Sequence, residues 1–397
     1  MIIADLHLHS RYSRATSKDM TLQKLEKWAK VKGIGLLGTG DFTHPKWLAE
    51  IKAGLAEDGS GVLRTKGGFP FLLTAEVSNL FPQGGKARKV HHVILAPSFA
   101  VVEEINAFLT TKGKLASDGR PIFGKYPAKD LVADLRDIDK GIEAIPAHIW
   151  TPWFGLLGSK SGFDSVEECY GDEAKHIHAL ETGLSSDPEM NWRVSSLDRF
   201  TLVSFSDSHS YWPWRIGRES TIFNCALRYD EIINALRTKE GYAGTIEVDP
   251  GYGKYHLDGH RGCSVSLLPK DSAEHKDRCP KCGKPLTIGV LHRVEELADR
   301  SAGFRPKDAA HFQRLVPLHE IISAVLGCGA STKKAWKYYN ALIDAFGSEL
   351  SCMLEATPEE LEKRAGKELA AAILDVREQR ITIKPGYDGV YGVPVFR

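Results

Sequence analysis

Short apolar runs rich in β-branched residues alternate with stretches of helical periodicity over residues 1–245. The apolar runs, which we expect to be strands, cover 1–4, 34–38, 71–74, 93–96, 142–147, 177–180 and 201–205. Between the first two runs, Leu22, Leu25 and Trp28 recur at the spacing of one helical face, which predicts a helix over 21–32. Alternation of this kind is typical of β/α units around a mostly parallel sheet.

Most of these runs lead directly into residue types that bind metal ions. In chain order these residues are His7 and His9, Asp41 and His44, Glu76, His148, Glu181, and Asp207 and His209. His91 and His92 stand before the fourth run instead. Because the carboxyl ends of barrel strands meet on one face, we expect the side chains that follow them to converge there.

The first and last of these pairs share one spacing. His7 and His9 are residues i and i+2 of an extended segment, so both imidazoles can reach one metal ion. Asp207 and His209 repeat this spacing after another strand, and the carboxylate of Glu76 can bridge two ions. Imidazole and carboxylate donors without thiolate suit a hydrolytic Zn²⁺, Mn²⁺ or Mg²⁺ cluster rather than a structural zinc site.

Three of the seven cysteines cluster in sequence. His260 and Cys263, and then Cys279 and Cys282, are each separated by two residues, which is the ligand spacing of zinc ribbons. We therefore expect a structural Zn²⁺ bound by these four residues. The alternatives to His260 are His256, His275 and His292.

The charge balance does not by itself predict a nucleic-acid partner, since 52 Lys and Arg stand against 51 Asp and Glu. Within 254–293, however, eight basic residues face four acidic ones, which fits either contact with a DNA backbone or a solvated surface. No apolar run approaches the ~18 residues of a membrane helix. Asp5 follows Met1 too closely for a signal peptide. We therefore expect a cytoplasmic protein with no membrane partner.

The chain after residue 300 has a helical pattern with glycines between short amphipathic stretches. The expected helices cover 315–326, 333–346, 358–365 and 368–377, and the tail 381–397 is expected to be extended. The glycines permit helix-hairpin-helix turns that bind phosphate, although an ordinary helical support domain is the more general explanation. The predicted domains are 1–245, a zinc-binding ribbon over 246–300, and a helical C-terminal domain with its tail over 301–397.

Aromatic and basic residues near the metal motifs are candidates for substrate binding. Trp150 and Trp153 follow His148, and Tyr211 and Trp212 follow His209. They can stack on an unpaired base, although core packing is the usual reason for aromatic residues. After His9, Arg11 and Arg14 can neutralise a phosphate oxygen or be ordinary surface residues.

The motifs together resemble the PHP family, named for polymerase and histidinol phosphatase. The matching residues are His7, His9, Asp41, His44, Glu76, His92, His148, Asp207 and His209. The resemblance implies a distorted seven-stranded β/α barrel with about two or three metal ions. It implies that Glu76 bridges two metals, that Asp207 binds the ion held by His7 and His9, and that His92 and His148 hold the second.

Two details of the PHP motifs differ in this sequence. The stretch after His9 lacks the further histidine of many members, and Asp41 and His44 are not adjacent, so the ligands of a third ion stay open. His91 competes with His92, and we prefer His92 because it immediately precedes the apolar run 93–96.

Longer strings resemble the endonuclease Q family. They are Ser13 to Lys18, Glu181 to Pro188, Asp258 to Arg261, Arg293 to Arg300 and Pro385 to Gly392. The resemblance implies a nucleoid-associated DNA repair endonuclease that cuts 5′ to uracil, hypoxanthine and abasic sites with metal-activated water. A sliding clamp is an additional partner to test. The expected catalytic residues are His7, His9, Arg14, Glu76, Asp207 and His209.

Two other functions remain open on the sequence. One is a small-molecule phosphatase of the histidinol-phosphate type, and the other is a non-catalytic DNA-binding protein. The predicted ribbon and helical domain argue against the first, and the nearly complete ligand set argues against the second. An ATP-driven helicase is not favoured, because the sequence has no Gly-rich phosphate loop of the Walker type.

Overall fold

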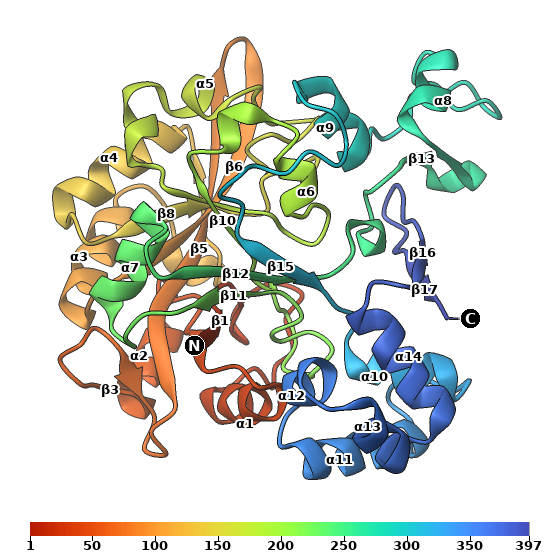
Figure 1. Cartoon of the computed structure of the whole chain (residues 1–397). Helices are drawn as coiled ribbons and strands as arrows, with labels where there is room; N and C mark the ends of the chain where they lie inside the picture. Colours follow the sequence, from red (N-terminus) through yellow and green to blue (C-terminus); the bar gives the residue numbers. More distant parts are fainter. Residues whose placement is uncertain (397) are drawn as a thin grey trace.

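A computed structural model describes residues 1–396 as a mixed α/β fold (Figure 1). The seven predicted strands are all present. They are β1 Ile2–Asp5, β2 Leu36–Gly38, β5 Pro70–Gln83, β6 Lys86–Ala96, β8 Glu143–Pro146, β9 Ala179–Glu181 and β10 Thr201–Val203.

The main sheet is less parallel than the sequence predicts. β1 pairs with β2, and β2 with β5, in parallel, whereas β6 is antiparallel to both β5 and β8. The reason is that β5 and β6 form one long hairpin through Gln83 and Lys86, so no helix reverses the chain between them. β9 and β10 pair in parallel as a separate two-stranded ladder.

Further strands extend the sheet at its edges. They are β3 Ala56–Glu57, β4 Leu63–Arg64, β7 Ile122–Gly124, β11 Ser220–Phe223, β12 Tyr242–Glu247 and β15 His311–Arg314. The order along the main path is β15-β12-β11-β1-β2-β5-β4-β3, with β6, β7 and β8 joined through β5 and β6.

Amphipathic helices cover the outside of the sheet (Figure 1). They are α1 Leu22–Lys32, α2 Pro45–Gly54, α3 Phe99–Thr110, α4 Ala128–Ile138 and α7 Tyr229–Thr238, with short helices α5 Val166–Tyr170 and α6 Pro188–Asn191 beyond them. α1 begins where the Thr21 side chain accepts a hydrogen bond from the Lys24 amide, and it ends at Gly33 in the left-handed conformation. Its buried Leu22 and Leu25 face the core, as predicted.

The cysteine-rich segment projects from the body of the molecule (Figure 1, upper right). It contains β13 Asp258–His260, β14 Val265–Leu267 and α8 Pro269–Glu274, and the following helix α9 Val290–Leu297 packs back on the main core. The apolar core of the segment itself is small and consists of Val265, Cys279 and Leu286. So small a core is typical of a module that needs a metal for stability.

The C-terminal region is helical, as predicted. Its helices are α10 Leu318–Val325, α11 Lys333–Phe346, α12 Glu349–Leu354, α13 Pro358–Ala365 and α14 Lys367–Arg377, and the tail forms the hairpin β16 Thr382–Lys384 with β17 Val393–Val395. Before these helices, however, β15 pairs in parallel with β12. The expected boundary at residue 301 therefore precedes a strand of the main sheet, whose sequence His-Phe-Gln-Arg has no β-branched residue to reveal it. Among residues 1–396, no helix has the length and apolar character that crossing a membrane requires.

Candidate metal centre

Four side chains from three distant parts of the sequence place their donor atoms within 4.8 Å of one another: His7, His9, Glu76 and Asp207. The Nε2 atoms of His7 and His9 lie 3.5 Å and 3.2 Å from Oε2 of Glu76. Oδ1 of Asp207 lies 3.6 Å and 3.1 Å from the same two nitrogens. The predicted convergence of these side chains is therefore present, although Glu76 lies within β5 and not after its end, because β5 continues to Gln83.

Glu76 joins this group to a second one. Its other oxygen, Oε1, lies 2.6 Å from Nδ1 of His91 and 3.2 Å from Nε2 of His148. These two nitrogens are 3.3 Å apart. The carboxylate thus lies between two sets of imidazoles, with one oxygen directed to each set, as a carboxylate that bridges two cations requires.

The second group contains His91 and not the preferred His92. Val93 lies opposite Glu76 in the β5–β6 ladder, and side chains two residues apart on a strand share a face, so His91 is on the Glu76 side. His92 is on the other face, where its Nε2 lies 2.6 Å from the hydroxyl of Tyr170. Adjacency to an apolar run was the wrong criterion, because strand register decides which histidine faces the cluster.

Asp41 and His44 do not join either group of donors. Oδ1 of Asp41 lies 3.0 Å from Nδ1 of His9, and its Oδ2 accepts hydrogen bonds from Ser10 and Ser13. Asp41 therefore orients His9. His44 immediately precedes α2 and stacks on Tyr12 with the ring centroids 4.5 Å apart, because the two residues that separate it from Asp41 lead the chain into the helix.

His209 lies at the edge of the first group. Its ring centroid is 4.4 Å from that of His9, and its Nδ1 lies 3.0 Å from the carbonyl oxygen of Asp207. About a third of its side chain is exposed. His209 therefore lies beside the first group of donors and is not one of its four members.

Two further residues contact the groups, and neither was predicted as a metal ligand or a catalytic residue. Glu181 accepts a hydrogen bond from the His148 amide at 2.7 Å and lies 2.9 Å from Nδ1 of His7. Its position at a strand end was the only signal. Nη1 of Arg120 lies 3.0 Å from Oε2 of Glu76, and no motif surrounds this arginine in the sequence.

Burial and neighbouring opposite charges have opposing effects on the pKa values of the cluster. Burial alone disfavours ionised Glu76, yet His91, Arg120 and His7 hold its pKa well below its ordinary value. Burial likewise disfavours protonated His7, yet Glu181, Glu76 and Asp207 raise its pKa well above its ordinary value. The carboxylates thus retain negative charge that only protons or cations can balance.

The donor set fits divalent cations. Nε2 of His7 is buried and has no hydrogen-bond partner, although three carboxylates surround the ring. A buried polar atom without a partner is costly unless something else satisfies it. Nitrogen and carboxylate oxygen at this spacing are ligands that Zn²⁺ and Mn²⁺ accept.

The backbone is strained where the cluster is built. Asp41, His148 and Asp207 have φ values of 46°, 32° and 45°, in the left-handed region that non-glycine residues rarely adopt. Each follows closely after a strand, namely β2, β8 and β10. Strain of this kind is retained where surrounding contacts fix the residue, and it is common at active sites.

A cavity of about 580 Å³ opens beside the cluster. His91, His148, Asp207, His209 and Arg120 contribute to its wall. Its volume is within the range of small-molecule and nucleotide sites. The donors are therefore accessible to a substrate although most of them are buried.

Of the four predicted aromatic residues, Trp153 alone lines this cavity. Its side chain is 39% exposed, and its ring packs edge-on against Tyr255. Trp150 is buried and donates to Asn191. Trp212 packs between Trp28 of α1 and Trp336 of α11, and Tyr211 is buried against it. These three are structural because they fill core or interdomain space.

The two predicted arginines lie outside the cavity. Arg11 pairs with Glu50 of α2 at 2.6 Å. The Arg14 side chain is 85% exposed and lies 3.7 Å from Asp118. The chain turns away from the cluster after His9, so both arginines point to the surface, whereas Arg120 lines the cavity.

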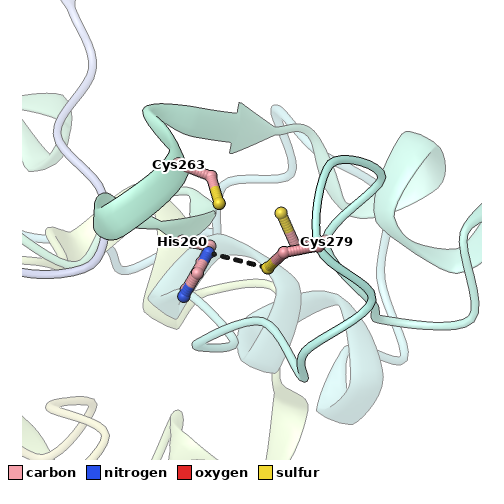
Figure 2. Close-up of side chains that lie close together, drawn as sticks. His260, Cys263 and Cys279 are labelled. Carbon is pink, nitrogen blue, oxygen red and sulfur yellow. Dashed lines mark hydrogen bonds between the residues drawn. The ribbon is translucent and has the colours of Figure 1, made fainter.

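The ribbon donors converge as the spacing predicts. His260, Cys263, Cys279 and Cys282 place their donor atoms within 4.8 Å of one another, and Figure 2 shows the first three directed toward a common point. Nδ1 of His260 lies 3.5 Å from Sγ of Cys282. The alternative His292 instead pairs with Asp258 at 2.6 Å, so His260 is the fourth donor of this group.

Solved structures similar to this chain cover nearly its whole length. The lesion-specific endonuclease PfuEndoQ from Pyrococcus furiosus is 33% identical with a TM-score of 0.88, over 99% of this chain and 94% of that chain. An endonuclease Q complex with a 27-mer duplex that carries an abasic lesion at the active site is also 33% identical, with a TM-score of 0.90 over 100% and 96% of the chains.

Two further comparisons concern parts of the chain. A family model described as the MJ0043 C-terminal domain matches residues 317–380, which contain α10 to α14. Protein MJ0043 of Methanocaldococcus jannaschii is 34% identical over 254 residues, which are 62% of this chain. They are 31% of that protein, so this chain spans about a third of its length.

Proposed function

This chain belongs to the endonuclease Q family of DNA repair endonucleases, and we propose that it cuts the phosphodiester on the 5′ side of damaged nucleotides. The observation that carries this proposal is the bridging position of Glu76 between two imidazole groups, at a cavity, in a chain that matches endonuclease Q throughout. The complex with an abasic duplex supports abasic sites as substrates. Uracil and hypoxanthine in DNA, and a sliding clamp as partner, remain predictions.

The metal ions would be held by this chain's own donors. His7, His9, Glu76 and Asp207 would bind one cation, and Glu76, His91 and His148 a second. Divalent cations bound there would neutralise phosphate charge and lower the pKa of water. Zn²⁺, Mn²⁺ and Mg²⁺ all remain candidates for these ions. The donor set contains no thiolate, which favours a hydrolytic metal site over a structural zinc site.

The residues around the donors have separate tasks. Arg120 is directed into the cavity and would bind a non-bridging phosphate oxygen once a cation replaces its contact with Glu76. Glu181 and Asp41 fix the rings of His7 and His9 through their Nδ1 atoms. Trp153 and Tyr255 provide an aromatic wall on which an extruded nucleotide can rest.

We further infer that the strands form the distorted seven-stranded barrel of the PHP family. The ladders connect β1, β2, β5, β6 and β8 in that order. The Ile149 amide then donates to the Glu181 carbonyl oxygen, which links β8 to β9. A parallel bridge between Leu8 and Ser208 links the end of β10 back to the end of β1. These contacts support a closed ring with the donors at one end.

The zinc-ribbon assignment is also a proposal. The three thiols and His260 suit a structural Zn²⁺, and the small apolar core of this segment supports a need for one.

The test is cutting of labelled duplexes that contain an abasic site, uracil or hypoxanthine, with each divalent metal added in turn. We expect one nick 5′ to the lesion and none in an undamaged duplex. Turnover of a phosphomonoester without any nick would establish the small-molecule phosphatase instead. Duplex binding without either reaction, with zinc in the ribbon alone, would establish a non-catalytic DNA-binding protein.

A further inference from the structure

Two arginines that the metal centre does not use line the same cavity. Arg215 and Arg218 both lie in the loop between Asp207 and β11. Nε and Nη2 of Arg218 donate to the carbonyl oxygen of Ser206 at 3.3 Å and 3.1 Å. The Arg218 residue is only 8% exposed. Within residues 1–396, neither guanidinium lies within ion-pair distance of a carboxylate.

This arrangement leaves the buried guanidinium of Arg218 bonded to a carbonyl oxygen and not to a carboxylate, with Glu219, Asp207 and Glu320 as the nearest acidic groups. Burial, followed by the neighbouring charge of Arg215, lowers the pKa of Arg218. Burial raises the pKa of the adjacent Glu219 and the charge of Arg218 opposes this shift, so Glu219 is at most a partial counterion. Buried charges are normally paired, so the buried Arg218, with the partly exposed Arg215 also in the cavity wall, offers a place for an anion there.

We propose that Arg215 and Arg218 form a second phosphate subsite, which binds a DNA phosphate next to the one that is cut. This inference rests on the proposed function, since it assigns part of the same cavity to the same strand. A guanidinium group is planar and can donate hydrogen bonds to two oxygens of one phosphate at once. Lys254, which also lines the cavity, adds a third positive charge to this wall.

The subsite gives a physical reason for preferring a polynucleotide. A phosphomonoester offers a single phosphate, which the metal donors and Arg120 would occupy. A strand with a neighbouring phosphate would occupy both subsites and would gain the charge-assisted hydrogen bonds of the arginines. Arg215 is the better residue to test, because Arg218 also supports the backbone just before Asp207.

The experiment measures duplex binding in the Asp207→Ala background by fluorescence anisotropy. The ligands are abasic duplexes in which one phosphate at a time, on either side of the lesion, is replaced by a neutral methylphosphonate. The proteins are the Asp207→Ala parent, its Arg215→Ala, Arg215→Lys and Arg215→Gln derivatives, and a matched Arg228→Ala derivative. Arg228 is an exposed arginine paired with Asp230 on the surface, so its removal controls for net charge.

We expect Arg215→Ala to weaken binding of the unmodified duplex about tenfold, as loss of a charged hydrogen bond does. A methylphosphonate at one position should weaken DNA binding by the parent by a similar factor. The same methylphosphonate should weaken binding by the Arg215→Ala derivative much less, because the neutral phosphate and the substitution remove the same contact. Arg215→Lys should recover part of the affinity. Arg228→Ala should give the parental pattern.

Equal binding by the parent and Arg215→Ala would overturn the subsite. So would an Arg215→Ala derivative that is as sensitive as the parent to every neutral phosphate. If Arg215→Ala melts at a lower temperature than the parent, the comparison of Arg215→Lys with Arg215→Gln decides, since these differ in charge. The wild-type protein could also show no nicking while the variants give the expected binding pattern. That result would contradict the proposed function but would support the phosphate subsite.

Discussion

Nδ1 of His7 lies 2.9 Å from Oε1 of Glu181, the last residue of β9, and the two residues are 174 positions apart in the chain. Both side chains are buried, and the second oxygen of Glu181 also accepts the His148 amide hydrogen. One carboxylate therefore orients residues of both donor groups. Glu181 contacts the Nδ1 side of the His7 ring and so directs Nε2, on the other side, toward Glu76 and Asp207.

Glu181→Ala should lower the affinity for barrel metals about 10- to 100-fold, as removal of a carboxylate behind a ligating histidine does. Metal titration followed by nicking should show activity restored at high metal concentration. Glu189→Ala, which removes an exposed carboxylate, is the control. Unchanged metal affinity in Glu181→Ala would contradict the orienting role.

The two neighbouring histidines of β6 should behave differently. His91→Ala removes a donor beside Glu76 and should abolish nicking and lower the metal content measured by mass spectrometry. His92→Ala removes a hydrogen bond to Tyr170 on the other face and should lower stability by about 1–3 kcal/mol while metal content is kept. The reverse result would mean that the register of the β5–β6 hairpin differs in solution.

Glu219→Gln should stabilise the protein at high pH. Burial raises the Glu219 pKa from 4.5 to about 8, so the folded state keeps a proton that the unfolded state releases above pH 4.5. The favourable contribution is complete below pH 4.5 and is lost as the pH rises to about 8. Glutamine is neutral throughout and avoids this loss.

Urea unfolding at pH 5.5 and pH 8.5 measures this effect. The free energy of unfolding of Glu219→Gln relative to wild type should increase by at least about 1 kcal/mol between the two values. Replacement of the exposed Glu240 by glutamine should show no such increase. If the free energy of unfolding of Glu219→Gln relative to wild type is the same at both pH values, Glu219 is ionised in the folded protein.

Cys279→Ala should remove one zinc ion per chain and unfold the ribbon locally, because the three remaining donors and the small apolar core cannot hold it. Cys169→Ala, which replaces a buried cysteine far from this group, should keep the zinc. Elemental analysis and limited proteolysis between residues 254 and 293 measure the two effects. Full zinc content in Cys279→Ala would exclude the predicted ligand set.

The sequence allowed the strands and most donors to be predicted, because both depend on local pattern. Apolar runs marked the strands, and the residues that follow them marked His7, Glu76 and Asp207. The pattern did not reveal β15, whose four residues lack a strand signature and are held only by pairing with β12.

The errors at the site have one common cause, which is that they depend on non-local geometry. The choice between His91 and His92 needed the register of β6 against β5, and the course of the chain after Asp41 decided that His44 lies elsewhere. Arg120 comes from the segment before β7 and carries no motif of its own, so only folding brings it to Glu76.

The most direct test of the central claim is single-turnover nicking of an abasic duplex by wild type and Asp207→Ala, with DNA binding measured in parallel. Asp207 should be essential, because its Oδ1 lies within 3.6 Å of both His7 and His9. The account predicts a metal-dependent nick 5′ to the lesion by the wild type, and no nick by the variant although it still binds the duplex. Nicking by Asp207→Ala at the wild-type rate would contradict a metal-dependent endonuclease at this site.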